Sequence, residues 1–185
     1  YDASGNVSSS QEVEETTNSV TNSTTTTTTN YDGSGNVTST QEKETSVDST
    51  TNATITITYT YDGSGNLVST QEEETVVNNN VTTITIVVTN NVTNETTTTV
   101  TTINEENDVI ESTETVVSED SNGVTTTTVT ISDNSGIISI QEIEVSEDTV
   151  TNVVTTTTTN LDASGTIIDS VEVEVTNDSN SDNYV

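Results

Sequence analysis

Residues 53–66 combine the two local patterns from which most of the chain is built: Ala53-Thr-Ile-Thr-Ile-Thr-Tyr-Thr60 and, directly after it, Tyr61-Asp-Gly-Ser-Gly-Asn66. In the first pattern, apolar or aromatic side chains alternate strictly with Thr, which is typical of a half-buried β-strand. In the second, Asp bonds nearby backbone amides and Gly supplies a positive φ, so the motif predicts a tight turn. Together the two patterns predict a strand that ends in a hairpin turn.

The turn motif returns along the chain, at first with a spacing of 30 residues. Tyr1, Tyr31 and Tyr61 each begin a copy, a looser copy begins at Asp133, and the last begins at Leu161. A decayed copy of the same loop length lies at residues 103–109. A unit of two strands and two turns is an antiparallel hairpin. We therefore expect an all-β fold of antiparallel hairpin repeats of about 30 residues, with about a dozen strands in an elongated sandwich-like or meander subunit.

One Thr-rich segment, residues 95–103, is additional to the hairpin units. An odd strand reverses the direction of every later hairpin, so this segment marks either a switch between two sheets or a boundary between sub-domains. Apolar residues are also more frequent after it. We therefore divide the chain into N-terminal hairpin repeats (1–90) and C-terminal hairpin repeats (91–185), with one continuous domain as the alternative.

The composition excludes most catalytic and binding chemistry. Lys43 is the one Lys or Arg against 31 Asp and Glu, the net charge is -30, and His, Cys, Met, Trp, Phe and Pro are absent. Without His or Cys there is no Ser-His-Asp triad, thiol nucleophile or ordinary zinc or copper site. The charge repels nucleic acid and anionic membranes, and no apolar run is long enough to span a bilayer. We predict that the chain is not an enzyme, binds no nucleic acid and does not insert into a membrane.

Two sets of carboxylates suit hard cations such as Ca²⁺. The turn aspartates Asp2, Asp32, Asp62 and Asp162 form the first set, which turn chemistry also explains without a metal. The second set consists of Glu pairs at i, i+2, a spacing that places both carboxylates on one strand face and would line them up in rows in stacked repeats. The pairs are Glu12/Glu14, Glu42/Glu44, Glu72/Glu74, Glu142/Glu144 and Glu172/Glu174. A solvated acidic face is the alternative. We expect no resident cofactor, with the turn aspartates as the Ca²⁺ candidates.

Asn-x-Ser/Thr sequons and long Thr tracts form a dense array for N- or O-linked sugar. The candidate glycosylation sites are Asn6, Asn22, Asn36, Asn52, Asn80, Asn91, Asn94 and Asn177. Regular Thr rows also suit an ice-binding surface. The plain alternative is that Thr, about a quarter of the chain, satisfies β propensity on a wet face.

Residues 59–67, Tyr-Thr-Tyr-Asp-Gly-Ser-Gly-Asn-Leu, resemble the YD repeat of Rhs and teneurin-type proteins. The resemblance covers about nine residues in each of three copies. It implies an architectural element, since that family coils hairpins into a hollow shell, and it carries over no catalytic residue. The whole chain resembles repetitive extracellular fibre and adhesin-stalk proteins.

These features favour a structural subunit of an extracellular or cell-surface β-rich fibre, which polymerises by strand pairing and carries sugar. Its expected partners are copies of itself, in a homopolymer, and glycans. The alternative is a binding module, either a Thr-array ice-binding surface or a Ca²⁺-binding adhesin repeat. Because the chain begins with Tyr1 and not Met, we expect a processed chain, a fragment, or part of something longer.

Overall fold

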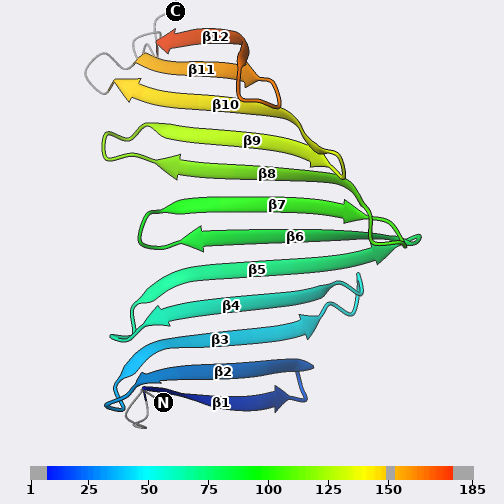
Figure 1. Ribbon diagram of the computed structural model, residues 1–185, viewed down its shortest axis with the longest axis vertical. Coiled ribbons are helices and arrows are strands. Elements are labelled where there is room, and N and C mark those ends of the chain that lie inside the picture. The colour runs from blue at the N-terminus through cyan, green and yellow to red at the C-terminus, as the bar shows by residue number, and fades with distance from the viewer. Residues whose placement is uncertain (1–7, 149–152, 177–185) are drawn as a thin grey trace, which may run out of the picture.

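All regular structure in the computed structural model is β-strand, over the described residues 8–148 and 153–176. The 12 strands form one sheet in chain order, and every neighbouring pair is antiparallel (Figure 1). The strands are β1 (Ser9–Asn18), β2 (Ser23–Asp32), β3 (Val37–Val47), β4 (Thr54–Asp62), β5 (Leu67–Asn78), β6 (Val81–Asn90), β7 (Glu95–Ile103), β8 (Val109–Glu119), β9 (Thr125–Asp133), β10 (Gly136–Asp148), β11 (Val153–Leu161) and β12 (Ile167–Thr176). The predicted all-β architecture of antiparallel hairpins is confirmed, in its meander form.

The side-chain alternation in β4 defines the two faces of the sheet. Ile55, Ile57 and Tyr59 lie on one face, which we call face 1, because successive side chains of a strand point to opposite sides. The opposite face carries the four Thr residues of β4 and is called face 2. Residues paired across neighbouring strands share a face, so the register assigns the rest of the sheet from this strand.

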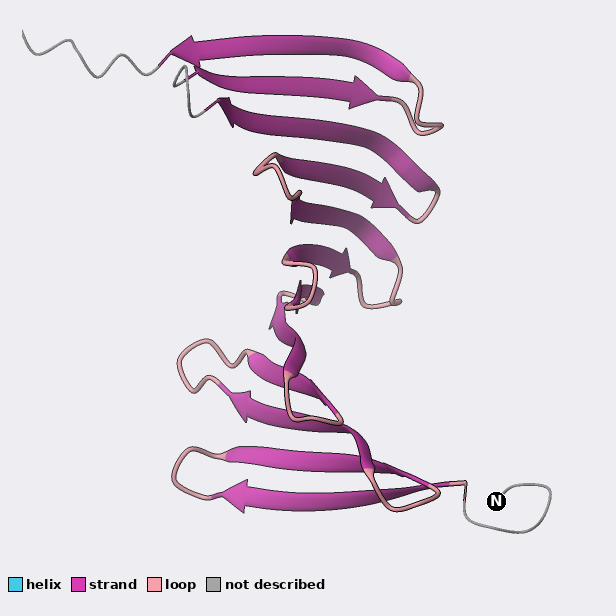
Figure 2. Ribbon diagram, turned by 90° about the vertical axis from the view of Figure 1, so that its left-hand side faces the viewer, coloured by secondary structure: helices cyan, strands magenta, loops and turns pink. Residues whose placement is uncertain are grey.

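Neither face of the sheet is covered by a second layer of described residues (Figure 2). Ala53 and Ser23, at 0% and 4% exposure, are the buried residues of the described chain. The exposed surface is 12444 Å², whereas a compact monomer of this mass would expose about 8,500 Å². Each strand contacts only the strands beside it. The sheet is therefore held by its backbone ladders and by contacts between neighbouring side chains.

The sheet is strongly twisted along its length (Figure 2). Antiparallel strands twist in a fixed right-handed sense, and the rotation accumulates over many strands when nothing flattens them. Neither face is therefore a flat plane.

The extra Thr-rich segment is β7, and its bounds agree with the sequence-based prediction. Its ladder with β6 is continuous, from Thr82 opposite Ile103 to Asn90 opposite Glu95, so the sheet does not divide there. The Glu-bearing strands β1, β3 and β5 run one way, whereas β8, β10 and β12 run the other way (Figure 1). The odd strand reverses the later hairpins within one sheet and does not start a second one.

Candidate functional site

Five loops share one geometry that is built on an Asp or Asn side chain. In the loop after β2, the Asp32 amide donates to the Asn36 carbonyl (2.8 Å) and the Gly35 amide donates to the Asp32 carbonyl (3.0 Å). Oδ1 of Asp32 accepts the amides of Ser34 (2.8 Å) and Asn36 (2.9 Å), and Oδ2 accepts the Asn36 side-chain amide (2.9 Å). Gly35 has φ 82°, as the turn motif predicts. The other loops of this form begin at Asp62, Asn104, Asp120 and Asp162.

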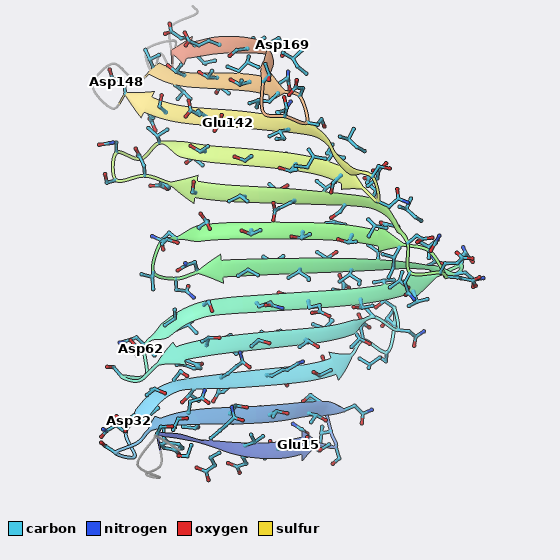
Figure 3. The ribbon with its side chains drawn as sticks, in the orientation of Figure 1. Glu15, Asp32, Asp62, Glu142, Asp148 and Asp169 are labelled. Carbon is cyan, nitrogen blue, oxygen red and sulfur yellow. The ribbon has the colours of Figure 1, made fainter. Side chains whose placement is uncertain are left out.

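These loop hydrogen bonds keep the aspartates ionised. The Asn36 side chain, followed by the backbone amides, holds the pKa of Asp32 below its ordinary value of 3.8, and Asn66 does the same for Asp62. The Ser164 hydroxyl is the main cause of the lowered pKa of Asp162. Asp32 and Asp62 are the last residues of β2 and β4 and lie on the same side of the sheet (Figure 3). A cation at either carboxylate would compete with the loop's own donors. Asp2 lies outside the described residues.

The Glu pairs lie on both faces, and not in one continuous set of rows. Glu42 is opposite Tyr59 and Glu72 is opposite Ile57, so these pairs lie on face 1; Glu14 joins them through Thr27. The row from Glu72 continues through β6 to β9 and reaches β10 at Gln141, so the next residue, Glu142, faces the other way. Glu142/Glu144 and Glu172/Glu174 therefore lie on face 2. The expectation of a single alignment is wrong, because the odd strand β7 exchanges the faces of every later repeat.

Thr-bearing strands separate the Glu pairs within each half of the sheet. Strands lie about 4.8 Å apart, so carboxylates on alternate strands are about 10 Å apart, whereas Ca²⁺ needs oxygens at about 2.3–2.6 Å. Within residues 8–148 and 153–176, no group of three or more acidic side chains could hold a metal ion. The arrangement keeps the Glu pairs of neighbouring repeats apart.

Tyr–Glu hydrogen bonds connect the first three repeats across strands. The Tyr31 hydroxyl donates to Glu12 Oε2 (2.9 Å), which raises the pKa of the phenol, and the Tyr61 hydroxyl donates to Glu42 Oε2 (3.5 Å). The residue 30 positions after Tyr61 is Asn91, which has no hydroxyl, so this Tyr–Glu link is absent there. Sequence reasoning missed these links, although the shared separation of 19 residues between Glu and Tyr in successive repeats was a visible signal.

The sequons within the described chain are exposed, and they lie in or beside loops. They are Asn22, Asn36, Asn52, Asn80, Asn91 and Asn94; Asn6 and Asn177 lie outside the described residues. Four have a positive φ: Asn22 (52°), Asn52 (58°), Asn80 (66°) and Asn94 (57°). Asn tolerates this left-handed conformation better than other residues with a side chain. A left-handed Asn that leads into a Thr-bearing strand accounts for these sequons without sugar.

Replacing Asn52 tests this turn role. We expect Asn52→Gly to leave the stability of the sheet nearly unchanged, and Asn52→Ala to lower it by about 1 kcal/mol, because Ala has no polar side chain to support φ 58°. Urea unfolding of the unglycosylated protein measures both, and each variant removes the sequon. Equal losses in the two variants would contradict a conformational role for Asn52.

The Thr rows of face 2 are interrupted in the N-terminal half. Lys43 of β3 separates Thr58 of β4 from Thr26 of β2, whereas the next row, Thr56–Thr45–Thr24, is unbroken. The rows also follow the twist of the sheet (Figure 2). A flat ice lattice would meet only short parts of such a surface.

The two outer strands leave one side of each backbone without a partner strand in the sheet. Among the described strands, β1 pairs only with β2, and every residue of β1 is exposed. β12 pairs only with β11, and its residues Val171 and Val173 are 56% and 51% exposed. Unpaired N–H and C=O groups along an edge strand are a template for another strand.

No protein-family model matches the sequence, and the comparisons with curated proteins and with solved structures found no match. The resemblance of the turn to the YD repeat therefore stays a prediction. In the described part of the chain, no helix is long and apolar enough to cross a membrane, and no pocket is present. The candidate functional elements are the sheet's two edges and its two faces.

Proposed function

We propose that the chain is a structural subunit of an extracellular β-rich fibre, in which copies polymerise by strand pairing between subunits. The observation that carries the proposal is an open, single-layer sheet whose two edge strands, β1 and β12, are both uncapped within the described residues. Pairing gives each edge the backbone hydrogen bonds that it lacks, as in recognition by strand addition.

The number of strands suits head-to-tail growth. Because successive strands are antiparallel and the sheet has 12 of them, β12 runs opposite to β1. A second copy stacked by translation would therefore place its β1 antiparallel to β12 of the first. The antiparallel alternation continues across the junction without a break, and nothing in the repeat limits the number of copies.

Charge also favours head-to-tail pairing over pairing of like edges. Two β1 strands in antiparallel contact would bring Glu12 and Glu14 of both copies together on face 1, and like charges on neighbouring strands are destabilising. Two β12 strands would do the same with Glu172 and Glu174. When β12 meets β1, the two Glu pairs fall on opposite faces, so each pair meets one acidic side chain of the other strand, Glu15 on face 2 or Asp169 on face 1, and not a second pair.

The exposed sequons support a glycan coat on the fibre. Six of them are accessible on the described sheet, and all but Asn22, which lies in the β1–β2 loop, are in or beside loops between inner strands. Sugar on those inner loops would leave β1 and β12 free to pair. Catalysis has no part in the proposal, because a chain without His or Cys and with one Lys offers few catalytic groups.

Imaging the purified chain tests the proposal. At micromolar concentration in moderate salt, we expect negative-stain electron microscopy to show filaments, and light scattering to rise with time and protein concentration. X-ray scattering should show the strand spacing of about 4.8 Å along the filament axis. Compact monomers at all concentrations and salt levels would overturn the proposal.

A further inference from the structure

The C-terminal half of face 1 has an uncharged interior. Its rows run through β8 to β12, and one of them connects Val117, Thr127, Ile143, Thr158 and Val171. We call the apolar members of these rows the valine patch: Val117, Val129, Ile131, Ile143, Val145, Val154, Val171, Val173 and Val175. Mainly Thr side chains fill the positions between them, and charged residues of this face lie at the margins.

The opposite face of the same strands carries the charge. Face 2 of β8, β10 and β12 presents Glu114, Glu142, Glu144, Glu172 and Glu174. The central rows of β8 to β12 are therefore acidic on face 2 and uncharged on face 1, although face 2 also carries Val116 and Ile140, and Glu119, Glu147 and Asp169 lie at the margins of face 1. In the N-terminal half, face 1 mixes the two, since Ile57 lies between Glu44 and Glu72.

The valine patch is large enough for a specific interface. Five strands about 4.8 Å apart, with about seven residues of each at about 3.3 Å, cover about 550 Å². Two such surfaces in contact bury about 1,100 Å², which exceeds the roughly 1,000 Å² expected of a specific protein interface. Val171, Val173 and Val175, at 56%, 51% and 54% exposure, have the most surface to lose.

We propose that the valine patch is the interface for a second copy of this chain, face to face, so that two single-layer sheets form a local sandwich. A second copy presents the same uncharged Val, Ile and Thr rows, and pairing leaves the Glu side chains of face 2 in water on both outer surfaces. A basic partner would instead find its counter-charges on face 2. This inference goes beyond the proposed function, because it uses a face and not an edge and does not require polymerisation.

Two neighbouring valines provide a matched test. Val116 and Val117 are adjacent in β8 and similarly half-exposed, but Val116 lies on face 2 and Val117 on face 1. In sedimentation of the full chain, we expect Val117→Glu to weaken the dimer at least about 100-fold, because it places a carboxylate in the interface. Val116→Glu makes the same charge change and is expected to leave the dissociation constant within about threefold.

The outcomes separate this inference from edge pairing. Face-paired sheets give a spacing of about 10 Å, and Val117→Glu should remove it while the strand spacing of about 4.8 Å stays. Val145→Glu, on the inner strand β10 and away from both edge strands, gives a second reading if Val117→Glu fails to fold. A monomeric wild type at about 100 µM, or equal weakening by Val116→Glu, would overturn the face-to-face dimer. A dimer that never elongates would contradict the proposed fibre and would support the face-to-face dimer.

Discussion

Removal of β12 is expected to stop head-to-tail growth, and removal of β11 together with β12 is expected to restore it. A chain that ends after Leu161 has 11 strands, so its last strand runs in the same direction as β1 and the junction could form only a parallel pair. A chain that ends after Asp148 has ten, and β10 again runs opposite to β1. Because each strand contacts only its neighbours, the remaining sheet has the same contacts in both variants.

Light scattering against protein concentration measures this effect. We expect the critical concentration of the 11-strand variant to exceed that of the full chain by at least about tenfold, since parallel pairing is less stable and lacks the hairpin register. The ten-strand variant is the control for loss of mass and should polymerise within about threefold of the full chain. Polymerisation of both variants to the same extent would show that β12 is not the growing edge.

Acidification is expected first to promote assembly and then to melt the sheet. As the pH falls from 7 toward the isoelectric point near 4.1, the net charge of -30 approaches zero and repulsion between copies disappears. The loop aspartates stay ionised through this range because hydrogen bonds lower their pKa from 3.8. A lowered pKa contributes stability above pH 3.8 that is lost as the pH falls through the folded-state value. Melting should therefore begin only below about pH 3.8.

Circular dichroism and light scattering at a series of pH values separate the two effects. Salt at pH 7 is the first control: about 1 M NaCl reduces the screening length to about 3 Å and should promote assembly without melting. The second is a variant in which Asp32, Asp62, Asp120 and Asp162 are all Asn, for which the natural Asn104 loop is the precedent. This variant should lose much of its acid melting. If the sheet melts before the chains assemble as the pH falls, the loop aspartates are not the groups whose protonation limits acid stability.

The hairpin architecture could be predicted because its signals are local. The alternation from Ala53 to Thr60 and the turn that follows Asp62 depend only on neighbouring residues, and the bounds of β7 follow from the Thr run that begins after Glu95. The number of layers could not be predicted in the same way. A strand that is half-buried against its neighbours in one layer shows the same alternation as a strand in a sandwich.

The candidate sites depended on register, which the sequence pattern does not supply. Glu72 and Glu142 occupy equivalent places in their repeats, yet they lie on opposite faces because β7 stands between them. The sandwich-like packing that the sequence allowed is absent from the described subunit. The loop at Asp120 was also missed. It joins β8 to the Thr-rich strand β9, whereas the repeated turn motif precedes a Glu-bearing strand, and it lacks the Tyr that marks the repeat.

The restriction of each strand to contacts with its two neighbours has a mechanical consequence. The strands lie across the long axis of the molecule (Figure 1), so tension along that axis would load the strand-to-strand ladders in series. The weakest ladder would open first and leave the others intact. Each 30-residue hairpin that opened would lengthen the chain by up to about 100 Å. A fibre of such sheets would yield one hairpin at a time and dissipate the load stepwise.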